Sequence, residues 1–386
     1  MRRTASTEFS PGLVRGSTAS EVVRRFPLRK MDKVLLFAAV GISIFGIIMI
    51  YSATRVDAPS TFYLKRQLMY FFLALVAMLL AAGFDYRKIM PYSRILYGIT
   101  IFLLLLVFVF PASGGAHRWI SLWFFDLQPS EVAKVAVILT LATFIADRRM
   151  EIRSNQEFLK ALGIALVPML LIFLEPDLGI TLSIFAIFVA MVLIGGARLK
   201  QMAALGAGTL VMVSAAIGLH LLKAYQVNRL MVFVKPGLDP LGAGYNLLQS
   251  KIAIGSGQLV GRGLFHGTQT NLKFIPAHHT DFIFSVVGEE LGFIGAMILL
   301  ALFAILVWRA FKVAATARDS FGTMVAVGIV VMFLFQILVN VGMTMGIMPV
   351  TGITLPFMSF GGSSLIINFI CVGLLLNISM RRFPQT

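Results

Sequence analysis

A short polar segment just before one of the long apolar runs carries the side chains best suited to chemistry. His278, His279, Thr280 and Asp281 follow one another there. A carboxyl group in a partly dry site has its pKa raised by desolvation and lowered by nearby cations. Such a group can accept a proton from a sugar hydroxyl, which makes Asp281 a candidate general base. The adjacent histidines suggest a metal, but their side chains point apart and no third ligand is evident, so we do not expect zinc.

Two opposite charges lie near the start of another apolar run. Glu131 and Lys134 are three residues apart, a spacing that places both side chains on one face of a helix. Charges are costly to bury in a membrane, so each is a functional candidate. The two either neutralise each other as a structural ion pair or face a substrate, and the spacing fits both. Ser130, which follows Gln128-Pro129, is predicted to cap this helix.

Arginines in the connections between apolar runs are candidates for binding phosphate, because a guanidinium group pairs well with phosphate oxygens. Arg118 precedes Trp119 in one connection, and Arg229 lies in another. A Trp at a membrane interface is commonly part of the aromatic belt. Arg118 and Trp119 therefore form either an anion-binding site or an interfacial anchor.

Further carboxylates flank other apolar runs. Glu175-Pro176-Asp177 joins two of them, where Pro176 favours a turn and Asp177 can cap the following helix. Glu175 and Asp177 could instead bind a cation or a basic partner. Glu289 and Glu290 follow the candidate base at helical spacing. They either complete a polar pocket or serve helix packing.

The elements that must position these residues are membrane helices. The chain has 386 residues, of which 58% are hydrophobic and 13% charged, whereas a soluble domain has about 25% charged residues. A helix of about 20 apolar residues spans a bilayer. The composition therefore excludes a soluble globular or nucleic-acid-binding protein, despite a net charge of +16. We attribute the basic excess to topology control and to attraction of anionic lipid head groups.

We expect an all-α polytopic membrane protein with ten transmembrane helices. The apolar runs are too long and too uniformly apolar for the strands of a barrel, and irregular backbone is not tolerated in lipid. The predicted spans are 34–52, 66–84, 93–111, 130–147, 159–175, 178–197, 202–222, 282–308, 322–346 and 358–380.

The distribution of Lys and Arg predicts the orientation. Most of the 33 basic residues lie in the N-terminal tail and in alternate connections, which favours a cytoplasmic location for both termini. Residues 1–30 are predicted to be a disordered basic tail, and residues 31–386 one membrane domain. The long outer segment 223–281 is not of low complexity. We expect it to be an ordered cap with a short amphipathic helix near 244–254, because loops this long are usually functional or disordered.

Several ordered blocks of the sequence together resemble the SEDS family (shape, elongation, division and sporulation proteins). The resemblance covers the chain from about Asp32 to Arg382, and its many blocks make it specific. Within the family, Gly267-Thr268-Gln269 and 251–257 are more similar to RodA than to FtsW. The matching blocks are His117-Arg118-Trp119-Ile120, Gln128-Pro129-Ser130-Glu131 with Lys134, Glu175-Pro176-Asp177-Leu178-Gly179, 239–245, 249–251, 267–269, 279–284, 288–292, and 349–352 through Gly361-Gly362-Ser363-Ser364.

The resemblance implies a peptidoglycan glycosyltransferase that polymerises lipid II at the outer face of the cytoplasmic membrane during cell-wall elongation. It implies that Asp281 is the catalytic residue. We expect substrate-binding roles for the following residues: Arg118, Trp119, Glu131, Lys134, Arg229, Gln269, Thr280, Glu289 and Ser363. The expected partners are a class B penicillin-binding protein (a transpeptidase), lipid II and membrane proteins of the elongation machinery. No organic cofactor is expected, whereas a divalent cation (Mg or Mn) could neutralise the substrate pyrophosphate.

Two other functions stay open. A lipid II flippase would also use buried charges such as Glu131 and Lys134, and a non-enzymatic scaffold for the transpeptidase would need neither. The long outer segment that ends at Asp281 favours chemistry on the outer face. Replacement of Asp281 by Ala distinguishes the three, because only the polymerase loses its activity.

Overall fold

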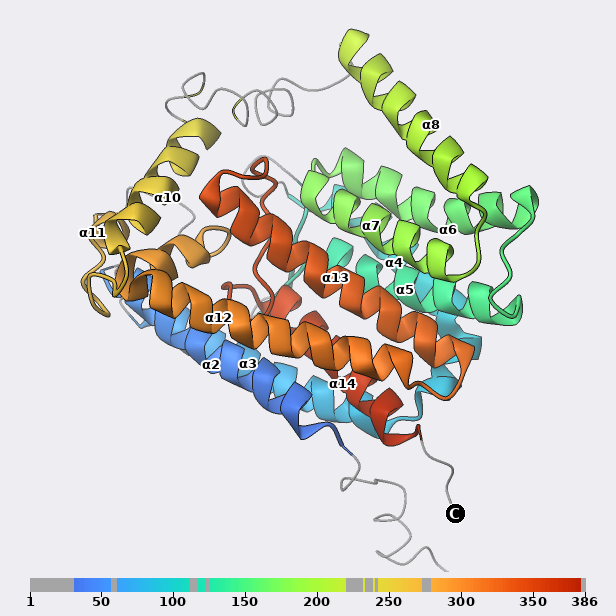
Figure 1. Cartoon of the computed structure of the whole chain (residues 1–386), viewed down its shortest axis with the longest axis horizontal. Coiled ribbons are helices and arrows are strands. Elements are labelled where there is room, and N and C mark those ends of the chain that lie inside the picture. Colours follow the sequence, from blue (N-terminus) through green and yellow to red (C-terminus); the bar gives the residue numbers. More distant parts are fainter. Residues whose placement is uncertain are drawn as a thin grey trace, which may run out of the picture.

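The computed structural model describes residues 31–56, 61–111, 117–122, 125–219, 242–272 and 279–382, together with Val232 and Asp239. This part of the chain is almost entirely helical (Figure 1). The predicted tail 1–30 and Arg229 lie outside it. The α-helices are α2 (Lys33–Thr54), α3 (Phe62–Gly83), α4 (Ser93–Leu106), α5 (Pro129–Asp147), α6 (Asn155–Leu174), α7 (Leu178–Ile194), α8 (Leu199–Gly218), α10 (Ala243–Gly257), α11 (Thr268–Asn271), α12 (Ile283–Ala315), α13 (Ser320–Met345) and α14 (Gly362–Met380).

Short elements complete the bundle. The 3-10 helices η2 (Tyr86–Tyr92) and η3 (Val107–Val109) extend α4 at its two ends. The strands β1 (Ile120–Leu122) and β2 (Phe125–Leu127) form an antiparallel hairpin in which Ile120 pairs with Leu127.

The predicted polytopic all-α architecture is confirmed. Among the described residues, nine helices are long and apolar enough to cross a membrane, and the 17-residue α7 is a shorter apolar helix. Each of these helices overlaps one of the predicted spans. The ends were predicted only to within a few residues, and the largest departures include α12, which continues to Ala315 rather than 308, and α14, which begins at Gly362 rather than 358. Hydropathy did not detect the polar last turns of α12 or the irregular apolar segment before α14.

Polar side chains fix several helix starts. Asp32, Ser154, Asp177 and Asp319 each accept a hydrogen bond from a backbone N–H in the first turn of α2, α6, α7 and α13. Such caps satisfy backbone donors that have no partner within the helix. The predicted cap by Asp177 is confirmed. The prediction for Ser130 is wrong, because Pro129 already occupies the first helical position of α5.

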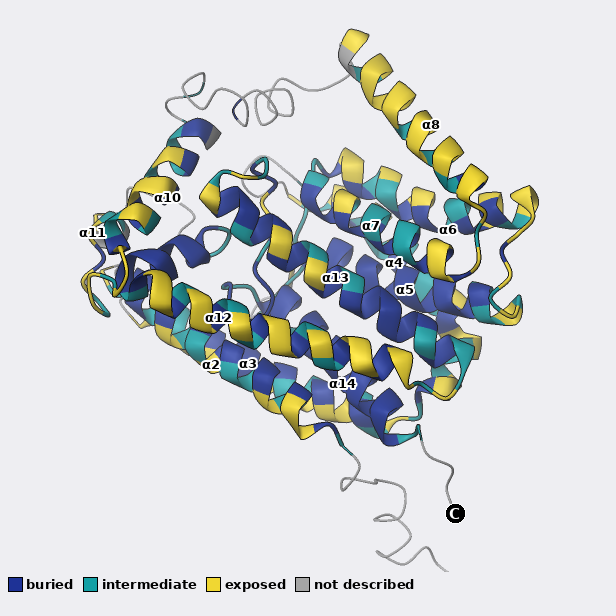
Figure 2. Cartoon of the chain, in the orientation of Figure 1, coloured by how far each residue is buried: buried dark blue, intermediate teal, exposed yellow. Residues whose placement is uncertain are grey.

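The helices differ sharply in burial (Figure 2). In α5 and α14, 83% of the most apolar 18-residue stretch of the helix is buried, whereas in α8 only 6% of that stretch is buried. Helix α13 packs against α5, α7 and α12, and α14 packs against α3. Figure 1 shows α8 reaching away from the other helices. The core therefore lies around α5, α13 and α14.

The bundle has two ends. We call the end at which α2 begins and α14 ends the terminal end, and the end that carries α10 and α11 the loop end (Figure 1). Ion pairs join helices at the terminal end, with Arg309 to Asp32 at 2.6 Å and Arg87 to Asp319 at 3.1 Å. The residues with candidate chemistry lie at the loop end.

Helix α10, which confirms the predicted helix near 244–254, packs its backbone directly on α12. Gly292 interrupts α12 with a φ of 63°, a conformation that costs most side chains strain. A Cβ atom there would lie 2.3 Å from the backbone nitrogen of Gly261. This contact therefore requires glycine at position 292.

Candidate active site

The candidate base lies where the chain re-enters the bundle before α12. The main-chain carbonyls of three consecutive residues, 279–281, each accept a hydrogen bond from elsewhere in the fold. The N–H of Phe360 donates to His279 at 3.0 Å, and the hydroxyl of Ser359 donates to Thr280 at 2.7 Å. The side-chain amide of Asn340 donates to Asp281 at 2.8 Å. The backbone at the candidate base is thus held from outside its own segment.

The partners of this segment come from α13 and from residues 346–361, which we call the return segment. The return segment is irregular and connects α13 to α14. Gly352 lies beside the candidate base, because a Cβ atom added to it would be 3.4 Å from Oδ2 of Asp281. As a whole residue, Asp281 is partly exposed. Its carboxyl lies against the backbone of the return segment.

An aromatic cluster covers one side of the re-entry point. The ring of His279 lies 4.8 Å from that of Tyr63 and 5.7 Å from that of Phe360. Tyr63 and Phe360 also meet edge to face at 5.2 Å. These contacts place His279 among aromatic rings, whereas His278 lies outside the described residues.

The predicted ion pair is buried in the first turns of α5. Lys134 Nζ and Glu131 Oε2 are 2.9 Å apart, and their side chains are 0% and 4% exposed. Nearby, Ser363 in the first turn of α14 accepts a hydrogen bond from the N–H of Gln128 and donates one to the carbonyl of Asp126. Ser363 thereby joins α14 to the hairpin and to the start of α5.

Arg118 is bound to the turn between α6 and α7. Its guanidinium group donates to the carbonyls of Glu175, at 3.0 Å, and Pro176. Trp119 is half-buried beside it in the chain. Gln128 donates to the carboxylate of Asp177 at 3.3 Å, and Asp177 in turn caps α7. The turn-and-cap interpretation of this segment is therefore confirmed, and Arg118 has a structural use.

The same turn contains a carboxyl group that holds its proton tightly. Glu175 is 1% exposed, and burial, with the neighbouring Asp177, raises its pKa to about 8 although Arg118 lowers it. Burial also raises the pKa of Asp177. A proton on Glu175 reduces the charge that this buried cluster has to compensate, because a buried charge is costly unless it is paired.

Glu289 and Glu290 form a separate group that anchors the loop after α10. Both are fully buried. Glu289 accepts hydrogen bonds from the N–H of Gln269, at 2.8 Å, and the hydroxyl of Thr268. Glu290 accepts from the hydroxyl of Ser52 at 2.6 Å and from the N–H of Phe265. The structure thus favours the packing alternative for this pair of glutamates.

The predicted residues fall into two groups around the return segment and one on α12. Asp281 and Thr280 lie on one side of the return segment. The polar residues of α5 and α7 lie on the other, where Gly179 abuts the carbonyl of Thr351. Glu289 lies further along α12, where it meets Gln269 of α11. Among the described residues, no three Asp, Glu, His or Cys side chains converge as metal ligands would.

Two positioning contacts were missed by the sequence reasoning. Asn340 is fully buried in α13 and Ser359 is 6% exposed, and both hold the re-entry segment. The available signal was an amide within an apolar run, because polar groups are costly inside a membrane. The same run also contains Gln336, so that signal does not single out Asn340.

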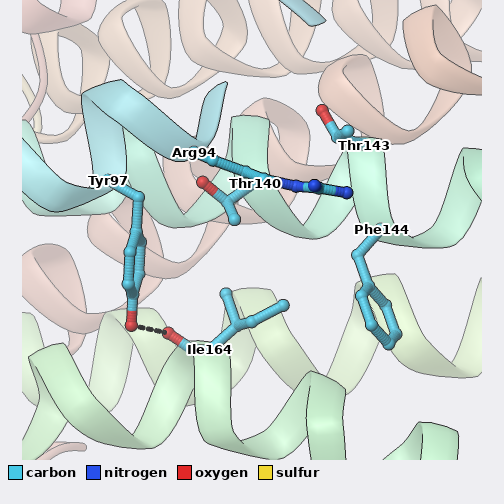
Figure 3. A pocket seen from close by; sticks show the side chains of 6 residues that line it. All are labelled: Arg94, Tyr97, Thr140, Thr143, Phe144 and Ile164. Carbon is cyan, nitrogen blue, oxygen red and sulfur yellow. Dashed lines mark hydrogen bonds between the residues drawn. The ribbon is translucent and has the colours of Figure 1, made fainter. Parts of the chain in front are cut away.

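A cavity of about 260 Å³ lies between α4, α5 and α6 near the terminal end (Figure 3). Its hydroxyl groups are already bonded within the protein, as in the 3.0 Å contact from Tyr97 to the carbonyl of Ile164. None of the predicted site residues lines it. The lining residues are Arg94, Tyr97, Thr140, Thr143, Phe144 and Ile164.

Known proteins match this chain over nearly its whole length. The FtsW/RodA/SpoVE family model, described as a cell cycle protein, matches residues 32–383. The probable peptidoglycan glycosyltransferase FtsW of Trichlorobacter lovleyi is 40% identical over 93% of this chain and 96% of its own. The peptidoglycan glycosyltransferase MrdB of Escherichia coli K12 is 38% identical over 91% of this chain and 94% of its own.

A solved structure shares the fold. One chain of a peptidoglycan synthase complex, described as coordinating polymerization and crosslinking, is 31% identical and superposes with a TM-score of 0.78. The match covers 92% of this chain and 99% of that one. On the strength of the family model and of relatives well above 30% identity, this chain belongs to the FtsW/RodA/SpoVE family.

Proposed function

We propose that this protein is a peptidoglycan glycosyltransferase that polymerises lipid II, with Asp281 as the general base. The observation that carries the proposal is the partly exposed Asp281, whose carboxyl lies against the return segment and whose backbone is held at three consecutive carbonyls. A base can act only if it is held within hydrogen-bond reach of the proton it removes. The glycosyltransferase names of the relatives support the reaction class.

The chemistry balances as one displacement. Asp281 takes the proton of the 4-hydroxyl group of the acceptor sugar, and the oxygen forms a bond to the anomeric carbon of the donor. The bond from that carbon to the undecaprenyl pyrophosphate breaks, and the pyrophosphate leaves with the electron pair. Direct displacement inverts an α-linked donor and yields a β-1,4 bond.

The leaving pyrophosphate needs positive charge, which the proposal assigns to Arg118, Lys134 and Arg229. Lys134 is enclosed and paired with Glu131, and Arg118 is bound to two carbonyls. Both would have to exchange part of these contacts for phosphate oxygens. A divalent cation would neutralise the same charge, but the described residues do not supply a set of three acidic or histidine ligands for one.

The orientation is part of the proposal. The excess of Lys and Arg in the tail and in alternate connections favours a cytoplasmic terminal end and an extracytoplasmic loop end. The membrane would be the bacterial cytoplasmic membrane, with residues 31–386 as one membrane domain and 223–281 on its outer side. Lipid-linked substrate displayed on the outer leaflet would then meet Asp281.

The proposed partner is a class B penicillin-binding protein. The support is the structural match to a chain from a synthase complex in which polymerization and crosslinking are coordinated. A role in elongation, with other membrane proteins of that machinery, rests on the RodA-like segments 251–257 and 267–269. The similarity to proteins named FtsW and MrdB is nearly equal.

The experiment uses purified protein, labelled lipid II and gel separation of glycan chains, with and without the transpeptidase. Asp281→Ala should abolish chain formation while the variant still folds and still binds its partner. Asp147→Asn is the matched control, because Asp147 is a half-exposed carboxylate at the terminal end. Chains made by Asp281→Ala at the wild-type rate would sink the proposal, and lipid II flipping that this variant retains would support a transporter.

A further inference from the structure

The side chain of Asn340, in α13, donates a hydrogen bond to the main chain of Asp281. Its amide nitrogen donates to the carbonyl of Asp281 at 2.8 Å and to the carbonyl of Ile353 at 2.7 Å. Both acceptors are carbonyl oxygens, so the nitrogen and not the oxygen of the amide must face them. A single side chain thus joins the candidate base to the return segment that lies against it.

The amide is retained for its two donors. Asn340 is fully buried, and its Oδ1 atom has no hydrogen-bond partner among the described residues. A buried acceptor without a partner is unfavourable and calls for an explanation. The explanation is that both N–H groups are needed at once, since a hydroxyl would supply only one donor and a carboxylate none.

The three groups that donate hydrogen bonds to residues 279–281 bond to different residues of that segment. Phe360 holds the carbonyl of His279 through its backbone N–H, and Ser359 holds the carbonyl of Thr280. Asn340 alone of the three holds the residue that carries the carboxyl. Asn340 also donates to the carbonyl of Ile353. The residue before Ile353 is Gly352, whose backbone lies beside the carboxyl of Asp281.

We propose that Asn340 is a positioning residue for Asp281, holding its backbone in register with the return segment so that the carboxyl meets the acceptor hydroxyl. The inference rests on the proposed glycosyl transfer. Asn340 itself does not touch the substrate; it acts through Asp281. A misplacement of a reacting group by about 1 Å can lower a rate about 100-fold, so loss of this contact should lower kcat and leave substrate binding nearly unchanged.

The chain offers a matched control at its other end. Asn377 in α14 is also fully buried, and its amide also donates to two main-chain carbonyls, those of Ala81 and Phe84. Asn340→Leu and Asn377→Leu each remove two amide donors from a fully buried site, and Asn377→Leu also removes the acceptor of a hydrogen bond from Arg381. Asn377→Leu should therefore lose at least as much stability as Asn340→Leu, although only the Asn340 site adjoins the candidate base.

The experiment measures glycan synthesis from labelled lipid II by the full-length protein, with its transpeptidase, well below the melting temperature of each variant. Rates are normalised to folded, monodisperse protein, and kcat and KM are determined separately. Asn340→Leu should lower kcat about 10- to 100-fold with little change in KM, while Asn377→Leu stays near the wild-type kcat. If a leucine variant does not fold, the milder pair Asn340→Ser and Asn377→Ser takes its place, because a short hydroxyl reaches at most one carbonyl.

The outcomes separate the inference from the function on which it rests. A fall in kcat confined to the Asn340 variant, at a loss of melting temperature no greater than that of the Asn377 variant, supports the inference. Equal kcat values for the Asn340 and Asn377 variants, with Asp281→Ala inactive, overturn the inference and leave the proposed function standing. An active Asp281→Ala variant overturns the proposed function, and the positioning role falls with it.

Discussion

At the scale of single residues, the Glu131–Lys134 ion pair has a clear geometry and two candidate roles, which are structural charge neutralisation and contact with the substrate pyrophosphate. The ammonium and carboxylate groups are 2.9 Å apart and enclosed. Removing one partner of a buried pair leaves an uncompensated charge, which costs about 3–5 kcal/mol, whereas replacing both by neutral groups is often tolerated. The stability of variants therefore reports on the structural role, and their polymerisation activity reports on the substrate role.

We predict that Glu131→Gln and Lys134→Met each lower the stability by about 3–5 kcal/mol, and that the double variant recovers most of the loss. Thermal unfolding in detergent measures this. If Lys134 also contacts the pyrophosphate, the double variant folds but polymerises lipid II poorly. A double variant with full activity would restrict the pair to a structural role.

The buried carboxyl of Glu175 predicts how stability depends on pH. Its pKa is raised from an ordinary value of 4.5 to about 8 in the folded protein, so the folded state binds the proton more tightly than the unfolded state does. The stabilisation is complete below about pH 4.5 and is lost as the pH rises through 8. The raised pKa of Asp177 has the same sign.

The melting temperature should therefore fall between pH 6 and pH 8.5, and Glu175→Gln should flatten that dependence. Scanning fluorimetry across this range gives the measurement. Glu157→Gln is the control, because Glu157 lies on the partly exposed surface at the other end of α6 and pairs with Arg148 at 3.4 Å. An unchanged slope in Glu175→Gln would contradict the assignment of the buried proton to this residue.

At the scale of the elements, sequence predicted the helices well because long apolar runs leave one solution in a membrane. It placed the end of α12 at 308 rather than Ala315, and the start of α14 at 358 rather than Gly362. Hydropathy reports how apolar a residue is, and it does not distinguish helical from irregular apolar backbone inside a protein. The proline and glycine residues of 346–364 do predict an irregular connection before the last helix, but they do not fix the residue at which α14 begins.

The site was predicted only in part, for a related reason. A charge next to an apolar run is conspicuous, so Asp281, Glu131 and Lys134 were found from sequence alone. The three donors that hold residues 279–281 come from α13 and the return segment. Contacts across such long stretches of chain follow from tertiary packing, and a single sequence carries no pattern that reveals them.

The contact between α12 and the loop after α10 yields a prediction at this scale. Gly292→Ala should lower the stability by about 1–3 kcal/mol, because its Cβ would lie 2.3 Å from the nitrogen of Gly261 at a φ of 63°. Gly163→Ala, in α6, is the control, since a Cβ atom there meets nothing within 4 Å. Thermal unfolding of the two variants tests the contact, and equal melting temperatures would refute it.

At the scale of the whole molecule, the two ends of the bundle carry different kinds of residues. The terminal end carries ion pairs that join helices, and the loop end carries the candidate base and the buried polar cluster. Helix α8 is almost entirely exposed and contributes little to the core. The proposed orientation puts the loop end outside the cell, where a lipid-linked glycan would be displayed.

Labelling of single cysteines tests this orientation directly. Cys371 is buried and can be replaced by Ala to give a thiol-free background. In intact cells, a membrane-impermeant maleimide should label Arg262→Cys at the loop end and should label Arg318→Cys only after permeabilisation. Both positions are exposed, so accessibility within the protein does not bias the comparison, and the reverse pattern would invert the topology.

The central claim is that the carboxyl of Asp281 removes the acceptor proton. Its most direct test is the rate of chain growth from labelled lipid II by Asp281→Asn, which keeps the shape of the side chain and removes its basicity. The account predicts a folded protein that binds lipid II and its partner and makes no glycan chains at any pH. Chain growth by Asp281→Asn at a rate near that of the wild type would contradict it.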